Sequence, residues 1–191
     1  MIVTNYLSAF ATGIALAVVG VATAQNPPTP APEKTAATPA PQPAAGDAAA
    51  LSTLRAVNKH EIAAAELAQS KKVDAATMDY AKMLQKDHTA NLEKVESISK
   101  LTKTPLAESP DVKTLEEKKK AERDTLAKLD GTSFQTAYLD AMIAGHADVL
   151  SQLDTKLLPG ATDAAVQQHL RATRESVNRH LTKAKELRGK Q

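Results

Sequence analysis

From residue 47 onward the sequence contains almost none of the residues that interrupt helices, and this feature constrains the fold most. Only three prolines and four glycines occur there, whereas Ala, Leu, Lys, Glu and Gln dominate. These five residue types have high helix propensities. No segment alternates between apolar and polar residues with a period of two. The sequence therefore predicts an all-α protein without a sheet.

The few helix breakers divide this part of the chain into five predicted helices. Asp74 can cap the second helix, Asp130-Gly131 ends the third, and Pro159-Gly160 is the sharpest expected turn. Thr132 or Ser133 can cap the fourth helix, and Thr162 or Asp163 the last. The expected ranges are about 48–71, 74–101, 111–129, 132–158 and 163–187.

Four of the predicted helices carry an apolar stripe. The second, for example, places Leu84, Val95 and Ile98 on one face, and the fourth places Tyr138, Met142 and Val149 on one face. Four amphipathic helices with a longer link between the second and the third of them predict an antiparallel four-helix bundle. The highly charged helix at 111–129 would then be an additional helix in the crossover connection.

The first 46 residues differ in kind from the rest. An apolar run at 6–24 ends in Ala22-Thr23-Ala24, the small-x-small pattern of a signal peptide 1–24 cleaved after Ala24. Cleavage would give a periplasmic or secreted protein. The run could also span a bilayer, which needs about 20 residues, so an uncleaved anchor facing the periplasm is the alternative. Membrane contact is expected only in that case. Residues 25–46 hold seven prolines and predict a disordered linker, followed by a helical domain at 47–191.

Composition excludes several classes of function. The chain has no Cys, which excludes disulfides, thiolate metal ligands and a lipoprotein anchor. Its formal net charge is only +2 and few rings follow the apolar run, so nucleic-acid binding is not expected. The run Lys118–Lys120 is expected to be a solvated helix face. Nothing in the sequence identifies a protein partner.

Three ionisable residues lie on the predicted apolar stripes: Glu61, His88 and His146. If both hairpin turns lie at the same end of the bundle, these residues agree in height within roughly 6 Å. His180 lies about 10 Å lower under the same assumption and is the fourth candidate.

The remaining polar and sulfur-containing neighbours are expected to have other roles. His60 and His169 are expected at the surface or rim, and Met142 in the core. Asp87 lies on a different face of its helix from His88, so it should point to solvent or to a neighbouring helix.

Imidazole and carboxylate groups in a bundle core are ligands that zinc, copper or iron accept. The sequence therefore predicts a metal site formed by Glu61, His88, His146 and His180. The alternative is that each His is bonded to a neighbour, in a structural or partner-binding envelope or stress module without a ligand.

The sequence argues against two sharper interpretations of this site. A di-iron site needs Glu-x-x-His on each of two helices, but Gln85 and Val177 precede His88 and His180 by three residues. No nucleophile–base pair or pair of acids stands out, so a non-catalytic protein is favoured over an enzyme and no reaction is identified.

Several motifs resemble those of one family. They include Met83 to Asn91 (Met-Leu-Gln-Lys-Asp-His-Thr-Ala-Asn), the pattern Tyr138-x-x-x-Met142-x-x-x-His146, and His180-Leu181-x-x-Ala184. The chain resembles domain-of-unknown-function family 4142 over about residues 48–187. The resemblance implies a bacterial exported protein with a ferritin-like helical fold and no established activity. It also implies that Glu61, Asp87, His88, His146 and His180 are the characteristic polar residues.

Overall fold

The computed structural model describes residues 45–191, and every regular element within them is helical. The expected signal peptide and nearly all of the expected linker lie outside these residues. The helices are α1 (Ala45–Gln69), α2 (Ala75–Thr102), α3 (Pro110–Leu126), α4 (Gly131–Gln152), the π-helix η1 (Leu153–Leu157), α5 (Leu158–Gly160) and α6 (Ala164–Arg188). Within this part of the chain, no helix has the combination of length and apolar character needed to cross a membrane.

Local sequence signals explain where several helices begin. The Asp74 side chain accepts a hydrogen bond from the Thr77 backbone N–H (2.7 Å), and that of Asp163 accepts from Val166 (3.1 Å), so both cap a helix. The fourth helix begins earlier than predicted, at Gly131. Glycine suits this position because its φ is +56°, a value that other residues rarely adopt.

The expected turn at Pro159-Gly160 is instead part of a helix. The backbone continues from α4 through the π-helix into the short α5, and extended backbone first appears at Ala161, where φ is −84° and ψ is 136°. The chain therefore reverses between Ala161 and Asp163, after the proline rather than at it. Pro159 has no N–H group to bond within this continuous helical run, and it lies two residues beyond the end of the π-helix, a form that occurs as single turns within α-helices.

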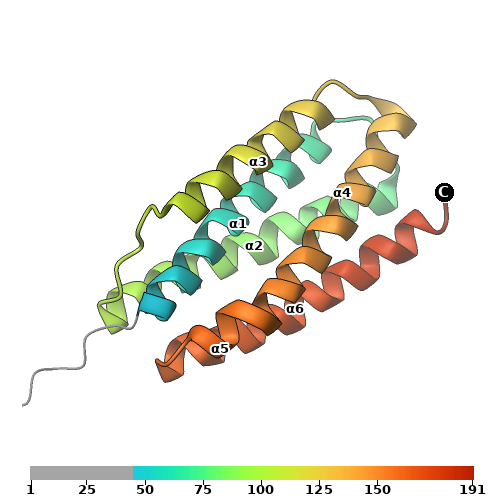
Figure 1. Ribbon diagram of the computed structural model, residues 1–191. Helices are drawn as coiled ribbons and strands as arrows, with labels where there is room; N and C mark the ends of the chain where they lie inside the picture. The colour runs from blue at the N-terminus through green and yellow to red at the C-terminus, as the bar shows by residue number, and fades with distance from the viewer. Residues whose placement is uncertain (1–44) are drawn as a thin grey trace, which may run out of the picture. The chain divides into compact units, whose positions relative to one another are not determined.

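The long helices pack in pairs: α1 runs along α2, α4 along α6, and α2 along α6, while α3 lies against α1 (Figure 1). The two hairpin turns lie at opposite ends, so the assumption that they share an end is wrong. Thr162, in the α4–α6 turn, donates its backbone N–H to Asp47 at the start of α1 (2.8 Å). Lys71, in the α1–α2 turn, instead contacts the α3–α4 turn through Asp130 (3.3 Å). Helix α3 causes this arrangement because it carries the chain back along the length of the domain.

The apolar core consists of two separate clusters along the helix axes. One cluster packs residues such as Leu54, Val95, Leu153 and Leu170. The other packs the residues that lie toward the α1–α2 turn, including Tyr80, Leu84, Phe134, Tyr138 and Met142. Between them, near the middle of each long helix, the buried side chains are polar.

Candidate metal centre

The polar layer between the two apolar clusters places four sequence-predicted residues at one height. Glu61 and His180 each follow the first residue of their helix by 16 positions. His88 precedes the end of α2, and His146 the end of α5, by 14 positions. These four helix ends lie at the same end of the domain, so the heights differ by only about 3 Å. All four side chains are at most 4% exposed.

Three imidazoles meet in this layer. The ring centroids of His88 and His180 are 5.2 Å apart, those of His146 and His180 5.4 Å, and those of His88 and His146 5.9 Å. One ring nitrogen from each residue can be chosen so that all three lie within 4.8 Å of one another. The histidines come from three helices, α2, α4 and α6, so the packing of these helices creates the cluster.

The hydrogen bonds of His88 determine which of its nitrogens is free. Nδ1 lies 2.8 Å from Oδ1 of Asn58, whose Nδ2 donates to Oδ1 of Asn91 (2.7 Å), and Nδ2 of Asn91 donates to Oγ1 of Thr173 (2.8 Å). This chain leaves the Asn58 oxygen as an acceptor, so Nδ1 of His88 is the protonated nitrogen. Nε2 is buried without a hydrogen-bond partner.

His146 and His180 follow the same pattern. Nδ1 of His146 donates to the Met142 carbonyl oxygen (2.7 Å), and Nε2 of His180 donates to Oδ2 of Asp87 (3.0 Å). The other nitrogen of each ring, Nε2 of His146 and Nδ1 of His180, is buried without a partner. Each imidazole is thus held by an oxygen acceptor at one nitrogen and has an unused lone pair at the other in its neutral form.

Burial keeps the imidazoles of His88 and His180 from accepting a proton easily. It is the main reason that the pKa of His88 lies well below the ordinary value of 6.5, and the neighbouring histidines lower it further. Burial also lowers the pKa of His180, although the hydrogen bond to Asp87 acts in the opposite direction. The free nitrogens of these two residues therefore carry lone pairs at neutral pH.

The cluster borders a small cavity of about 20 Å³, which is lined by His88 and His180 together with Asn58 and Thr173. This is about the space that one water molecule needs. The three histidines are close enough together to hold one small ligand such as a metal ion, and the cavity lies beside two of the three rings.

Glu61 lies beside this cluster, but its carboxylate does not belong to the group of ligand atoms that lie within 4.8 Å of one another. A methyl group added to Gly145, next to His146, would be 3.8 Å from Oε1 of Glu61 and 3.2 Å from Nζ of Lys119. Burial raises the pKa of Glu61, whereas His146 and Lys119 lower it. Oε2 of Glu61 is buried without a partner.

Several residues around the cluster differ from the sequence-based expectations. His60 and His169 are not surface or rim residues, because they are only 4% and 7% exposed. Helix α3 covers His60, and Nη1 of Arg123 lies 2.7 Å from its Nδ1. Lys119 is also buried, at 8% exposed, so the lysine run is not wholly a solvated face. Met142 is in the core as predicted, at 1% exposed.

Sequence reasoning missed the role of two side chains in this layer. The sequence predicts that Asp87 points to solvent or to a neighbouring helix. Asp87 does contact the neighbouring helix α6, but its hydrogen bond to the His180 ring was not predicted. Asn58, which fixes the tautomer of His88, was not identified. It follows Leu54 by four residues on the apolar stripe of α1, and a buried amide at that position is a signal that could have revealed it.

The fold and the site define residues 45–191 as an all-helical domain with a buried cluster of three histidines. A family profile described as "Domain of unknown function (DUF4142)" matches residues 32–187, so the chain belongs to this family. No curated protein matches the chain, and no solved structure matches it.

Proposed function

We propose that this protein is an exported ferritin-like four-helix bundle that binds one transition-metal ion through His88, His146 and His180. The observation that carries the proposal is the arrangement of the three rings. Each has one nitrogen bonded to an oxygen acceptor and the other buried without a partner. A buried nitrogen lone pair without a partner is costly, and a bound ion would satisfy three of them at once.

The surrounding groups are those that support histidine ligands. Metal-binding histidines usually donate their second N–H to a carboxylate, a carbonyl or another acceptor, which fixes the tautomer and the orientation of the ring. Asn58, the Met142 carbonyl and Asp87 would have this role. Neutral imidazole suits zinc, copper and iron, and three such ligands leave a coordination position for water or another group. The nitrogens must approach one another for ligation, because zinc–nitrogen bonds are about 2.0–2.1 Å long.

Two features support the ferritin-like assignment. One long crossover between two helical hairpins is typical of ferritin-like folds, and α3 with its flanking loops forms such a connection between α2 and α4. Binding groups that project from facing helices into the middle of the bundle are also typical of this class.

Export is supported by the apolar run at 6–24 and its Ala22-Thr23-Ala24 ending. N-terminal sequencing of the protein from a periplasmic fraction tests it. A mature chain that begins at Gln25 supports cleavage, whereas an intact chain in the membrane fraction supports the N-terminal anchor.

Metal titration tests the function itself. The chelator-treated full-length protein should bind Zn²⁺ or Cu²⁺ with a stoichiometry near one ion per chain. His88→Ala, His146→Ala and His180→Ala should each remove most of the affinity, whereas His169→Ala should not. A dissociation constant weaker than about millimolar, or binding that survives all three substitutions, would leave a structural or partner-binding module without a ligand.

A further inference from the structure

A second polar site lies on the other side of α1, in a cleft between α1 and the crossover helix α3. Its volume is about 240 Å³. The polar residues that line it are Lys59, His60, Glu116, Lys119, Lys120 and Arg123. Four of these side chains are cations and one is a carboxylate, whereas the whole chain has a formal net charge of only +2. Positive charge is therefore concentrated at this cleft.

The cations of the cleft are not all neutralised by acidic neighbours. Among residues 45–191, Lys59 and Arg123 form no salt bridge, unlike Lys119, which pairs with Glu122 (3.1 Å). Lys120 pairs with Asp124 (2.6 Å) on the exposed surface, where both side chains are more than half exposed. Such a surface pair contributes little stability, so Lys120 can exchange Asp124 for another anion at little cost.

A buried donor adjoins this cationic cleft. Arg123 can only donate, so the 2.7 Å contact makes Nδ1 of His60 an acceptor and places the ring proton on Nε2. That Nε2–H group is buried without a partner. Burial, followed by the charges of Lys119 and Arg123, lowers the pKa of His60 to about 3. His60 thus remains neutral while the positive potential around it stays available to an anion.

We propose that the α1–α3 cleft binds a tetrahedral oxyanion of the phosphate type, held by Lys59, Lys120 and Arg123. Arg supplies a planar pair of N–H donors that matches phosphate oxygens, and the two lysines supply mobile ammonium groups. The cleft is open to solvent and has room for either inorganic phosphate or the phosphoryl group of a small organic molecule. The site is separate from the histidine cluster and does not depend on the proposed metal.

Calorimetric titration of the full-length protein at constant ionic strength tests this proposal. Inorganic phosphate and glycerol phosphate are the two probes, and chloride is the reference. We expect saturable binding of at least one probe. Binding of both assigns the site to the phosphoryl group itself, and binding of one alone identifies its source.

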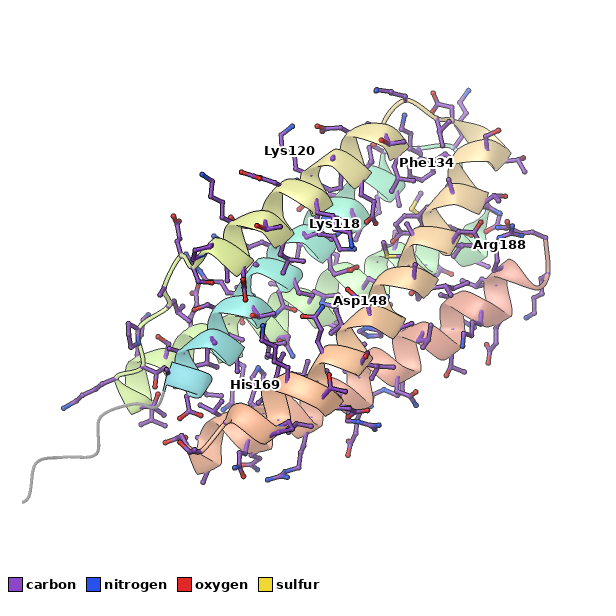
Figure 2. All side chains as sticks on the ribbon, in the orientation of Figure 1. Lys118, Lys120, Phe134, Asp148, His169 and Arg188 are labelled. Atoms are coloured by element: carbon purple, nitrogen blue, oxygen red, sulfur yellow. The ribbon has the colours of Figure 1, made fainter. Side chains whose placement is uncertain are left out.

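Matched variants then locate the binding. Lys59→Gln and Arg123→Gln should each weaken binding about tenfold, because each removes a charged hydrogen-bond donor. Lys118→Gln makes the same charge change at an exposed position on α3 that does not line the cleft and lies on a different side of the helix from Lys120 (Figure 2). It should change the affinity by less than twofold. Lys59 is itself exposed, so its substitution should not disturb folding even if that of Arg123 does.

Two results would overturn the proposal. One is the absence of saturable binding of either probe beyond that of chloride. The other is an equal loss of affinity in Lys118→Gln and Lys59→Gln, which would indicate diffuse attraction to surface lysines rather than a site.

Discussion

Oδ2 of Asp87 accepts a hydrogen bond from Nε2 of His180 at 3.0 Å, and this contact ties α2 to α6 beside the histidine cluster. The two partners differ in environment, since the Asp87 side chain is 37% exposed and that of His180 only 3%. The carboxylate therefore reaches inward from the surface to fix the tautomer of a buried ring. Nδ1, the nitrogen left free, is the one that the proposed metal site uses.

The first prediction concerns this carboxylate. Asp87→Asn keeps the size of the side chain but weakens the acceptor that orients His180. Loss of such an outer contact typically lowers metal affinity 10–100-fold, and we expect a loss in this range for Zn²⁺, measured by competition with a chelator. Asp148→Asn is the matched control, because Asp148 is an exposed residue of α4 (Figure 2) and accepts a hydrogen bond from Gln152 (3.1 Å) rather than from a histidine. Equal affinities of the two variants would contradict a role for Asp87.

The second prediction separates Glu61 from the histidines. Because Glu61 does not belong to the set of three close nitrogens, Glu61→Gln should change zinc affinity by less than about threefold, whereas His146→Ala should remove most of it. The same calorimetric titration measures both variants. A loss with Glu61→Gln as large as that with His146→Ala would make the carboxylate a fourth ligand.

The third prediction concerns the contact between α1 and the α4–α6 turn. Asp47 is 1% exposed and accepts hydrogen bonds from the backbone N–H of Thr162 (2.8 Å) and of Asp163 (3.2 Å). Asp47→Ala leaves these donors without their partner and should lower the free energy of unfolding by about 1–3 kcal/mol, measured by urea denaturation.

An exposed aspartate provides the control for Asp47. Asp79→Ala, in α2, should change the free energy of unfolding by less than about 0.5 kcal/mol. If Asp47→Ala has an effect no larger than this, the buried contact does not stabilise the domain.

The fourth prediction is a pH dependence of stability that arises from His169. Burial, with a contribution from Lys94, lowers the pKa of His169 from 6.5 to about 4. Between these two values the unfolded chain binds a proton that the native state does not. His169 therefore has no effect on stability above pH 6.5 and lowers it as the pH falls toward 4. The loss by pH 5 should be about 1–2 kcal/mol after allowance for solvent screening.

The variant His169→Gln isolates this effect. Urea denaturation of the wild type and the variant at pH 7.5 and pH 5 should give a smaller loss of stability in the variant. Identical losses in the two proteins would show that the pKa of His169 does not change on folding.

The sequence predicts the secondary structure of this protein better than its tertiary contacts. Helix composition and the Asp74 cap are local properties, so they can be predicted without knowledge of the packing. The burial of His60 and Lys119 depends on which helix α3 covers, and that is a tertiary choice without a local signal.

The common height of Glu61, His88 and His146 could be predicted even with a wrong assumption about the turns. Glu61 and His88 belong to one hairpin, so their relative height does not depend on where the α4–α6 turn lies. His146 is 15 residues from the start of α4 and 14 from the end of α5, so its height is nearly the same when counted from either end. The predicted height of His180 is wrong, because His180 is 16 residues from the start of α6 but only 8 from its end. The partner of each ring could not be predicted, because a hydrogen bond such as that between Asn58 and His88 depends on side-chain orientation rather than on helical spacing.

The most direct test of the proposed centre is a nitrogen NMR spectrum of the full-length protein with ¹⁵N-labelled histidine. Before metal is added, His88 and His146 should be protonated at Nδ1 and His180 at Nε2. One equivalent of Zn²⁺ should shift the three unprotonated nitrogens together and leave the signals of His169 nearly unchanged. Unchanged signals of all three histidines, or a shift of His169 instead, would contradict the account.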